Sequence, residues 1–181
     1  MIFKDTKLSG VFVVELEALE DERGFFARSW CAREFEEHGL QTRFVQSNIS
    51  FNKNKGTLRG MHYQAAPHPE VKLVRCTRGA IFDVVIDLRP DSPTFTQWIS
   101  ITLTADNHMS AYIPKGFAHG FQSLEDCSEV FYQMSEFFAP ECARGVRWND
   151  PAFGIKWPPG ERTISKKDQG YPDFKSLEFR L

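Results

Sequence analysis

From Phe44 onward the chain is a succession of short apolar segments, each closed by Gly, Pro, Asn or Asp. The clearest of these segments are residues 71–76, 80–88, 98–103 and 110–113. Strands of this length with turn residues between them are typical of a sandwich, a jelly roll or a barrel. The sequence therefore predicts an all-β protein.

The two ends of the chain carry weaker signals. Residues 11–28 predict two strands joined by a turn at 21–24, and one short helix is expected over 30–37 with Ser29 as its N-cap. The tail from Asp150 is rich in proline and predicts an ordered wrap with little regular structure. Without a linker or low-complexity segment, the 181 residues are expected to form a single domain.

Composition excludes several classes of function. Lys and Arg number 22 against 24 Asp and Glu, with no basic block, so the charge pattern of a nucleic-acid-binding protein is missing. The four cysteines form no C-x-x-C pair and the N-terminus lacks an apolar signal core, so we expect a cytoplasmic protein with free thiols. Asp83 and Asp87 interrupt the longest apolar runs, so no membrane span is expected.

Two segments combine polar side chains that could carry chemistry. One is residues 59–64, which contain His62 and are followed by Lys72, and the other is residues 114–121, which contain His119. The Pro-x-Gly-x-x-His spacing of the second segment resembles the second half-motif of the cupins, a hairpin whose histidine points into a small β-barrel. Metal-binding cupins carry a second histidine where this chain has Gln64.

A metal site is one interpretation of these segments. It would use His62, Gln64, Glu70 and His119, as in a metal-dependent cupin oxygenase or isomerase. Neutral imidazole is a far better ligand for divalent iron, manganese or zinc than a carboxamide, and Lys72 on the same inward face would put a cation beside the metal. Gln64 and Lys72 therefore weaken the metal interpretation.

Acid–base chemistry without metal is the other interpretation. His62 has an ordinary pKa near neutrality and suits a general base, the Tyr132 phenol can donate a proton, and Lys72 can stabilise an oxyanion. Taken singly, such residues are more often structural, as a core histidine, a barrel-wall tyrosine or a solvated lysine. Their occurrence together with the two motifs favours a functional role.

The motifs together resemble one family, the dTDP-4-dehydrorhamnose 3,5-epimerases. The resemblance runs from about residue 20 to Asp168 in stretches at 21–26, 46–50, 56–64, 72–79, 83–89, 114–121 and 144–151. It implies a cupin-type jelly-roll β-barrel with one or two short helices and an extended C-terminal wrap. It also implies a nucleotide-sugar substrate and no cofactor.

The resemblance further implies a metal-free epimerisation of a nucleotide-linked 4-keto-6-deoxyhexose. The leading hypothesis is conversion of dTDP-4-dehydro-6-deoxy-D-glucose to dTDP-4-dehydro-L-rhamnose. In the family's pattern His62 is the base and Asp168 its dyad partner, while Lys72 stands near the sugar O4. Tyr132 returns a proton from the opposite face of the ring.

Further residues match the family's binding positions. The resemblance assigns the diphosphate to Arg59 and Lys167, the nucleotide to Gln46 and Asn48, the sugar site to His119, and a position near the substrate to Phe138. The family forms homodimers by exchanging N-terminal strands, here about residues 1–30. Arg23 and Phe26 would then reach across from a second subunit and complete composite active sites.

Three positions depart from the family's pattern. Phe137-Phe138 stands where a tyrosine pair is usual, Ala143 where a glutamate commonly precedes Arg144, and Arg28 where some members carry Glu. Phenylalanine can stack on a base but donates no hydrogen bond. The residues implied in catalysis are intact, so the departures bear on the choice of nucleotide and on whether one carbon or two is epimerised. The alternatives are an epimerase for C3 or C5 alone and a non-catalytic sugar-nucleotide-binding barrel, and the full acid–base set argues against the second.

Overall fold

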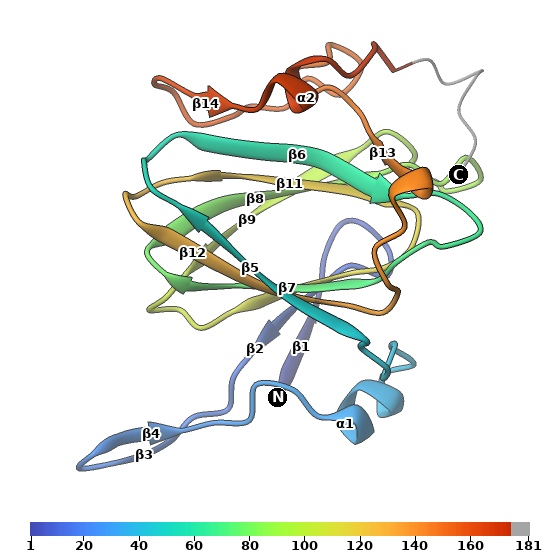
Figure 1. The fold of residues 1–181 in the computed structure, drawn as a ribbon. Coiled ribbons are helices and arrows are strands. Elements are labelled where there is room, and N and C mark those ends of the chain that lie inside the picture. Colours follow the sequence, from blue (N-terminus) through green and yellow to red (C-terminus); the bar gives the residue numbers. More distant parts are fainter. Residues whose placement is uncertain (175–181) are drawn as a thin grey trace.

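The computed structural model describes residues 1–174 and contains two facing sheets of antiparallel strands (Figure 1). The first sheet has the order β1-β2-β10-β7-β12-β5, with β1 Ile2–Asp5, β2 Phe12–Glu15, β10 Ser110–Ile113, β7 Lys72–Arg78, β12 Ser128–Met134 and β5 Gln46–Asn52. The second has the order β13-β6-β11-β8-β9, with β13 Ala143–Gly145, β6 Thr57–Gln64, β11 Phe117–Ser123, β8 Ala80–Asp87 and β9 Trp98–Thr104. The predicted all-β jelly roll is confirmed.

The main hydrophobic core lies between the two sheets. On β8, Ile81 and Val85 point into this core, while Val84 and Ile86 on the other face belong to a second apolar cluster under the C-terminal segment. A strand covered on both faces needs apolar residues at nearly every position. This double burial explains the almost unbroken apolar run of residues 80–88, in which Asp83 faces the interior with Ile81 and Val85.

The C-terminal segment covers the outer face of the second sheet (Figure 1). After the 3-10 turn η1 (Pro140–Cys142) and β13, the chain forms β14 (Thr163–Ile164), which pairs in parallel with β6, and helix α2 (Lys166–Gln169). The Ser165 side chain caps α2 by accepting a hydrogen bond from the backbone N–H of Asp168. The predicted wrap with little regular structure is confirmed, and α2 is a second short helix whose position was not predicted.

The N-terminal segment packs on the outer face of the first sheet. Helix α1 (Ala32–Glu37) buries Phe35 against Val14, Leu73 and Tyr112. The prediction of Ser29 as N-cap is wrong, because the helix begins two residues later than expected and its N-cap position is Cys31, which makes no side-chain cap bond. Burial of the Phe35 ring, rather than a cap, therefore decides where this short helix lies.

A separate hairpin is formed by β3 (Leu19–Asp21) and β4 (Gly24–Phe26), and the predicted turn at 21–24 joins its strands. The hairpin extends away from both sheets (Figure 1), and its residues Leu19 and Phe26 are 70% and 73% exposed. In the part of the chain that the structure describes, no helix has the length and apolarity needed to cross a membrane.

Candidate active site

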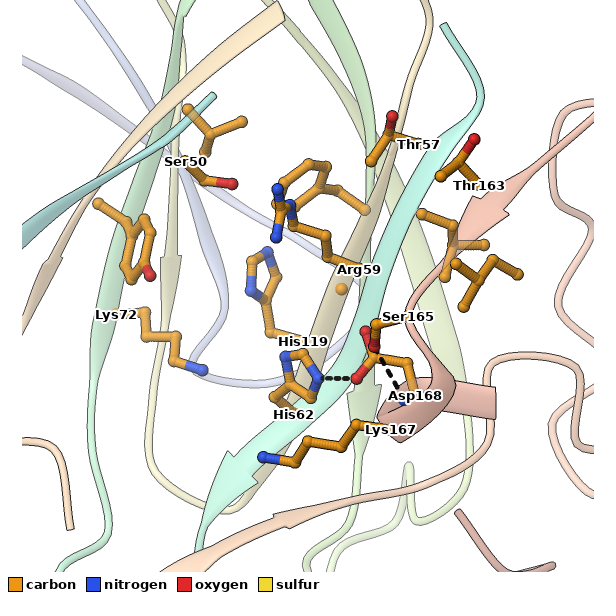
Figure 2. Close-up of a pocket in the computed structure, with 16 residues that line it drawn as sticks. Ser50, Thr57, Arg59, His62, Lys72, His119, Thr163, Ser165, Lys167 and Asp168 are labelled. Atoms are coloured by element: carbon orange, nitrogen blue, oxygen red, sulfur yellow. Dashed lines mark hydrogen bonds and ion pairs between the residues drawn. The ribbon is translucent and has the colours of Figure 1, made fainter. Parts of the chain in front are cut away.

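A cavity of about 510 Å³ opens between the sheets and the C-terminal segment (Figure 2). Its lining includes seven predicted site residues: Arg59, His62, Lys72, His119, Tyr132, Lys167 and Asp168. A second cavity of about 490 Å³ shares His62, Lys72, Tyr132 and Lys167 with the first and adds Gln46, Asn48 and Phe138. All predicted site residues except Arg23 and Phe26 therefore line one continuous region.

His62 on β6 is hydrogen-bonded to Asp168 on α2. The distance from His62 Nε2 to Asp168 Oδ1 is 2.7 Å, and the Gly60 backbone N–H donates to the other carboxylate oxygen at 3.3 Å. Burial would raise the pKa of Asp168, but its hydrogen bond and charge interaction with His62, and further hydrogen bonds, leave that pKa below its usual range. The ionised carboxylate accepts the Nε2 proton, so Nδ1 of His62 is the nitrogen free to act as a base.

Lys72 and Tyr132 face His62 from the opposite sheet, on β7 and β12. The Lys72 ammonium lies 3.0 Å from the Glu70 carboxylate, and in Figure 2 the lysine points toward the two histidines. Burial, followed by the charge of Glu70, raises the pKa of Tyr132, whereas Arg59 and a hydrogen bond with Asn48 act in the opposite direction. The phenol is therefore protonated at neutral pH and able to donate.

His119 on β11 lies directly across from His62 on β6 and has its own carboxylate. Its Nε2 lies 2.6 Å from Oδ2 of Asp83, which is fully buried on β8. Sequence reasoning missed this role of Asp83 and used the residue only to exclude a membrane span. The signal was present, because an acidic residue inside an apolar strand requires a partner.

Arg59 is held by a buried asparagine. Its Nε donates to Oδ1 of Asn52 at 2.8 Å, and Asn52, only 1% exposed, donates in turn to the carbonyl oxygens of Ser50 and Ser128 at 3.1 Å. The guanidinium is thus held at one side of the cavity, and Lys167 lies at the other (Figure 2). Asn52 was also missed, since nothing in the sequence pairs it with Arg59.

The donors of the metal interpretation are engaged elsewhere. The Gln64 amide donates to the carbonyl oxygens of His68 and Phe137 and accepts from the backbone N–H of Ala139, while Glu70 is paired with Lys72. Within residues 1–174, no group of three or more His, Cys, Asp or Glu side chains is arranged to hold a metal ion. The donor set does not fit a metal centre.

The second cavity is bordered by the residues expected at the nucleotide. Gln46 Oε1 accepts a hydrogen bond from the Phe138 backbone N–H at 3.1 Å, and Gln46 Nε2 lies 3.4 Å from Asn48 Oδ1. Phe138 is 55% exposed and lines this cavity, so its side chain is accessible to a bound group. Arg144 donates to the carbonyl oxygens of Glu141 and Ala143 at the same border.

Arg23 and Phe26 lie apart from the other predicted site residues. Both belong to the β3–β4 hairpin, and the Arg23 guanidinium pairs with Asp21 while remaining 84% exposed. The structure of one chain does not bring either residue to the cavities.

The sequence model of the dTDP-4-dehydrorhamnose 3,5-epimerases matches residues 5–176. The chain belongs to this epimerase family. A dTDP-4-dehydrorhamnose 3,5-epimerase from Shigella flexneri is 43% identical over 175 residues, covering 96% of each chain.

Solved structures of family members agree with this assignment. A dTDP-4-dehydrorhamnose 3,5-epimerase from Elizabethkingia anophelis has a TM-score of 0.95 at 38% identity, with 99% of each chain covered. A Legionella pneumophila epimerase in complex with dTDP-4-keto-L-rhamnose has a TM-score of 0.86 at 40% identity, covering 92% of this chain and 89% of that one. A 3'-monoepimerase from Streptomyces bikiniensis, in complex with dTDP-quinovose, is 31% identical with a TM-score of 0.86, covering 93% of this chain and 85% of that one.

Proposed function

We propose that the protein epimerises dTDP-4-dehydro-6-deoxy-D-glucose to dTDP-4-dehydro-L-rhamnose without a metal. The observation that carries the proposal is the His62–Asp168 pair, which faces Lys72 and Tyr132 across one cavity. The names of the family members and the dTDP-sugar bound to the Legionella protein support the same substrate class.

The first half of the reaction removes a proton from a carbon next to the C4 ketone. Such a C–H is only weakly acidic, so a positioned base and stabilisation of the enolate oxygen are both needed. His62 Nδ1 takes the proton, and the Asp168 carboxylate stabilises the resulting imidazolium. The Lys72 ammonium stabilises the negative charge that develops on O4 of the sugar.

The second half returns a proton to the same carbon from the other side. Tyr132 lies on β12 of the first sheet and His62 on β6 of the second, so the sugar ring can lie between donor and base. Donation by the phenol inverts the configuration at that carbon. The same pair acts at C3 and at C5, because both carbons flank the C4 ketone.

The remaining cavity residues bind the substrate. Arg59 and Lys167 hold the diphosphate, since a guanidinium fork and an ammonium both pair with phosphate oxygens. Gln46 and Asn48 bind the nucleotide, Phe138 stacks on its base, and His119 lines the sugar site.

We also propose that residues 1–181 act as one domain in a homodimer whose N-terminal strands, about residues 1–30, are exchanged. The projecting β3–β4 hairpin and the exposure of Phe26 support this proposal, because a large apolar side chain is expected to be covered in the working assembly. Arg23 and Phe26 would then complete the partner's cavity. A cytoplasmic location is proposed on the four free cysteines.

A second candidate is epimerisation at one carbon only. It is favoured by Phe138, which lacks the hydroxyl of the family's usual tyrosine, and by the similarity to a 3'-monoepimerase. The two candidates share the base and the acid, so they differ only in which carbon the bound sugar presents to them.

Proton exchange in heavy water tests the proposal. The purified protein is incubated with dTDP-4-dehydro-6-deoxy-D-glucose and the product is analysed by NMR, with His62→Ala as the matched inactive control. We expect deuterium at both C3 and C5 with the wild-type protein and at neither carbon with the variant. Incorporation at one carbon supports the second candidate, and a requirement for stoichiometric iron, manganese or nickel would overturn the metal-free mechanism.

A further inference from the structure

Glu70 and Lys72 form an ion pair inside the active-site region, and the mechanism above uses only the lysine. Glu70 lies two residues before Lys72, just before β7 begins, and the two side chains turn toward each other. Their charged groups are 3.0 Å apart, and the two side chains are only 7% and 11% exposed. Each charge is therefore compensated mainly by the other.

The pairing limits where the lysine can go. A lysine has a long flexible stem and a compact charge, so an unpaired ammonium turns to any anion within reach. The substrate brings its own anion, the diphosphate, which we have assigned to Arg59 and Lys167 in the same region. A carboxylate on the barrel wall competes with that diphosphate for Lys72.

Glu70 also acts on the proton donor. Burial raises the pKa of Tyr132 most, and the negative charge of Glu70 raises it further, whereas Arg59 and the hydrogen bond with Asn48 lower it. His62, Lys72 and Lys167 line both cavities together with the phenol. The other titratable groups are Arg59, His119 and Asp168 in the first cavity and Tyr63, Glu70, Arg144 and Tyr171 in the second. Glu70 is thus placed to influence both the oxyanion-binding lysine and the acid.

We propose that Glu70 is a positioning residue that tethers the Lys72 ammonium beside His62 and Tyr132, so that it does not turn to the diphosphate. The same carboxylate sets the alkaline limit of activity through Tyr132. Both statements rest on the proposed function, in which Lys72 stabilises the enolate and Tyr132 donates a proton.

Glu70→Gln tests the proposal, since it removes the charge and keeps the shape. Activity requires a protonated Tyr132 and is lost as the pH rises through the pKa of the phenol. Removing the negative charge lowers that pKa, so the alkaline limb of kcat/KM moves to lower pH. We also expect kcat at pH 7 to fall about threefold to tenfold, because Lys72 is misplaced. Inhibition by dTDP should become tighter as the freed ammonium reaches the diphosphate.

Two further variants separate charge from position. Glu129 lies on β12, the strand of Tyr132, but on its outer face, where it accepts a hydrogen bond from the Thr77 hydroxyl. Glu129→Gln removes an equal charge there and should leave the pH profile of kcat/KM unchanged. Glu70→Asp keeps the charge but shortens its reach, so kcat should fall while the alkaline limb stays near the wild-type position.

The proposal is overturned if folded Glu70→Gln keeps the wild-type pH profile and dTDP inhibition, or if Glu70→Asp behaves like Glu70→Gln in its pH profile. These outcomes differ from the result expected if the proposed function is wrong. If it is wrong, the wild-type protein itself incorporates no deuterium into the dTDP-sugar.

Discussion

The histidines and the lysine that line the cavity from β6, β7 and β11 each have a carboxylate partner. The pairs are His62–Asp168 at 2.7 Å, His119–Asp83 at 2.6 Å and Lys72–Glu70 at 3.0 Å. A carboxylate partner stabilises the buried Lys72 ammonium, and the hydrogen bond to a carboxylate holds each histidine ring in one orientation. Side-chain pairing therefore decides which nitrogen or ammonium group faces the substrate.

Asp168→Asn should lower kcat by about 10²–10⁴-fold. An amide at this position can donate to Nε2 of His62, which places the imidazole proton on Nδ1, the nitrogen that must accept the substrate proton. Because Arg59 and Lys167 are untouched, the affinity for dTDP should stay within about twofold of wild type. Steady-state kinetics and calorimetric titration with dTDP measure both quantities, and a kcat within about threefold of wild type would argue against the dyad.

At the level of elements, β6 and β11 approach each other very closely. A Cβ atom on Gly60, whose φ is 137°, would lie 2.6 Å from the Cα atom of Gly120, and a Cβ on Gly120 would lie 2.7 Å from the carbonyl oxygen of Arg59. Only glycine fits at such a crossing. His62 and His119 lie opposite each other on these two strands. Gly60 and Gly120, which lack side chains, therefore help to place the two histidines by allowing the close approach.

The edge strand β5 contributes through Asn52, which orients Arg59 of β6. Asn52→Ala should raise KM about tenfold with little change in kcat, because a hydrogen bond to a charged group holds the diphosphate ligand and takes no part in proton transfer. Steady-state kinetics with the dTDP-sugar give the two constants separately, and thermal unfolding confirms that the variant is folded.

A matched variant sharpens the test of Asn52. Asn52→Asp keeps the size but adds a carboxylate beside Arg59, so dTDP should bind more weakly than to Asn52→Ala. An unchanged KM in both folded variants would show that Arg59 does not depend on Asn52.

At the level of the whole molecule, the predicted site is divided between parts of the chain that do not meet within one protomer. The cavities contain the base, the acid and the diphosphate ligands, whereas Arg23 and Phe26 lie on the projecting hairpin (Figure 1). In the proposed exchanged dimer, both parts would come together. Two-fold symmetry would then give two equivalent composite sites.

Complementation tests this arrangement. Arg23→Ala and His62→Ala should each lose most activity, but a co-refolded equal mixture should regain about a quarter of wild-type activity, since half of randomly formed dimers are mixed and each has one intact site. Activity is measured before and after co-refolding, with each variant refolded alone as the control. If the mixture gives only the mean of the two variants, Arg23 does not act across the dimer.

Much of the fold was predictable from local sequence. The apolar segments at 71–76, 80–88, 98–103 and 110–113 correspond to β7, β8, β9 and β10, and the turn at 21–24 lies where it was expected. The prediction of the helix N-cap was wrong because the position of α1 depends on the packing of Phe35 against the first sheet, which is a contact between residues distant in sequence. Helix α2 was missed because four residues carry no detectable period, and its place depends on the pairing of β14 with β6.

Local sequence was enough to predict the all-β fold and the family, because short strands and the motifs around His62 and His119 are local patterns. It also predicted the side chains that line the cavities. The resemblance also gave Asp168 as the partner of His62, but the partners of Arg59, His119 and Lys72, which are Asn52, Asp83 and Glu70, came from the tertiary structure alone. Alternation along a strand indicates which face a side chain occupies, but the group opposite it comes from another strand whose register is set by packing of the whole barrel.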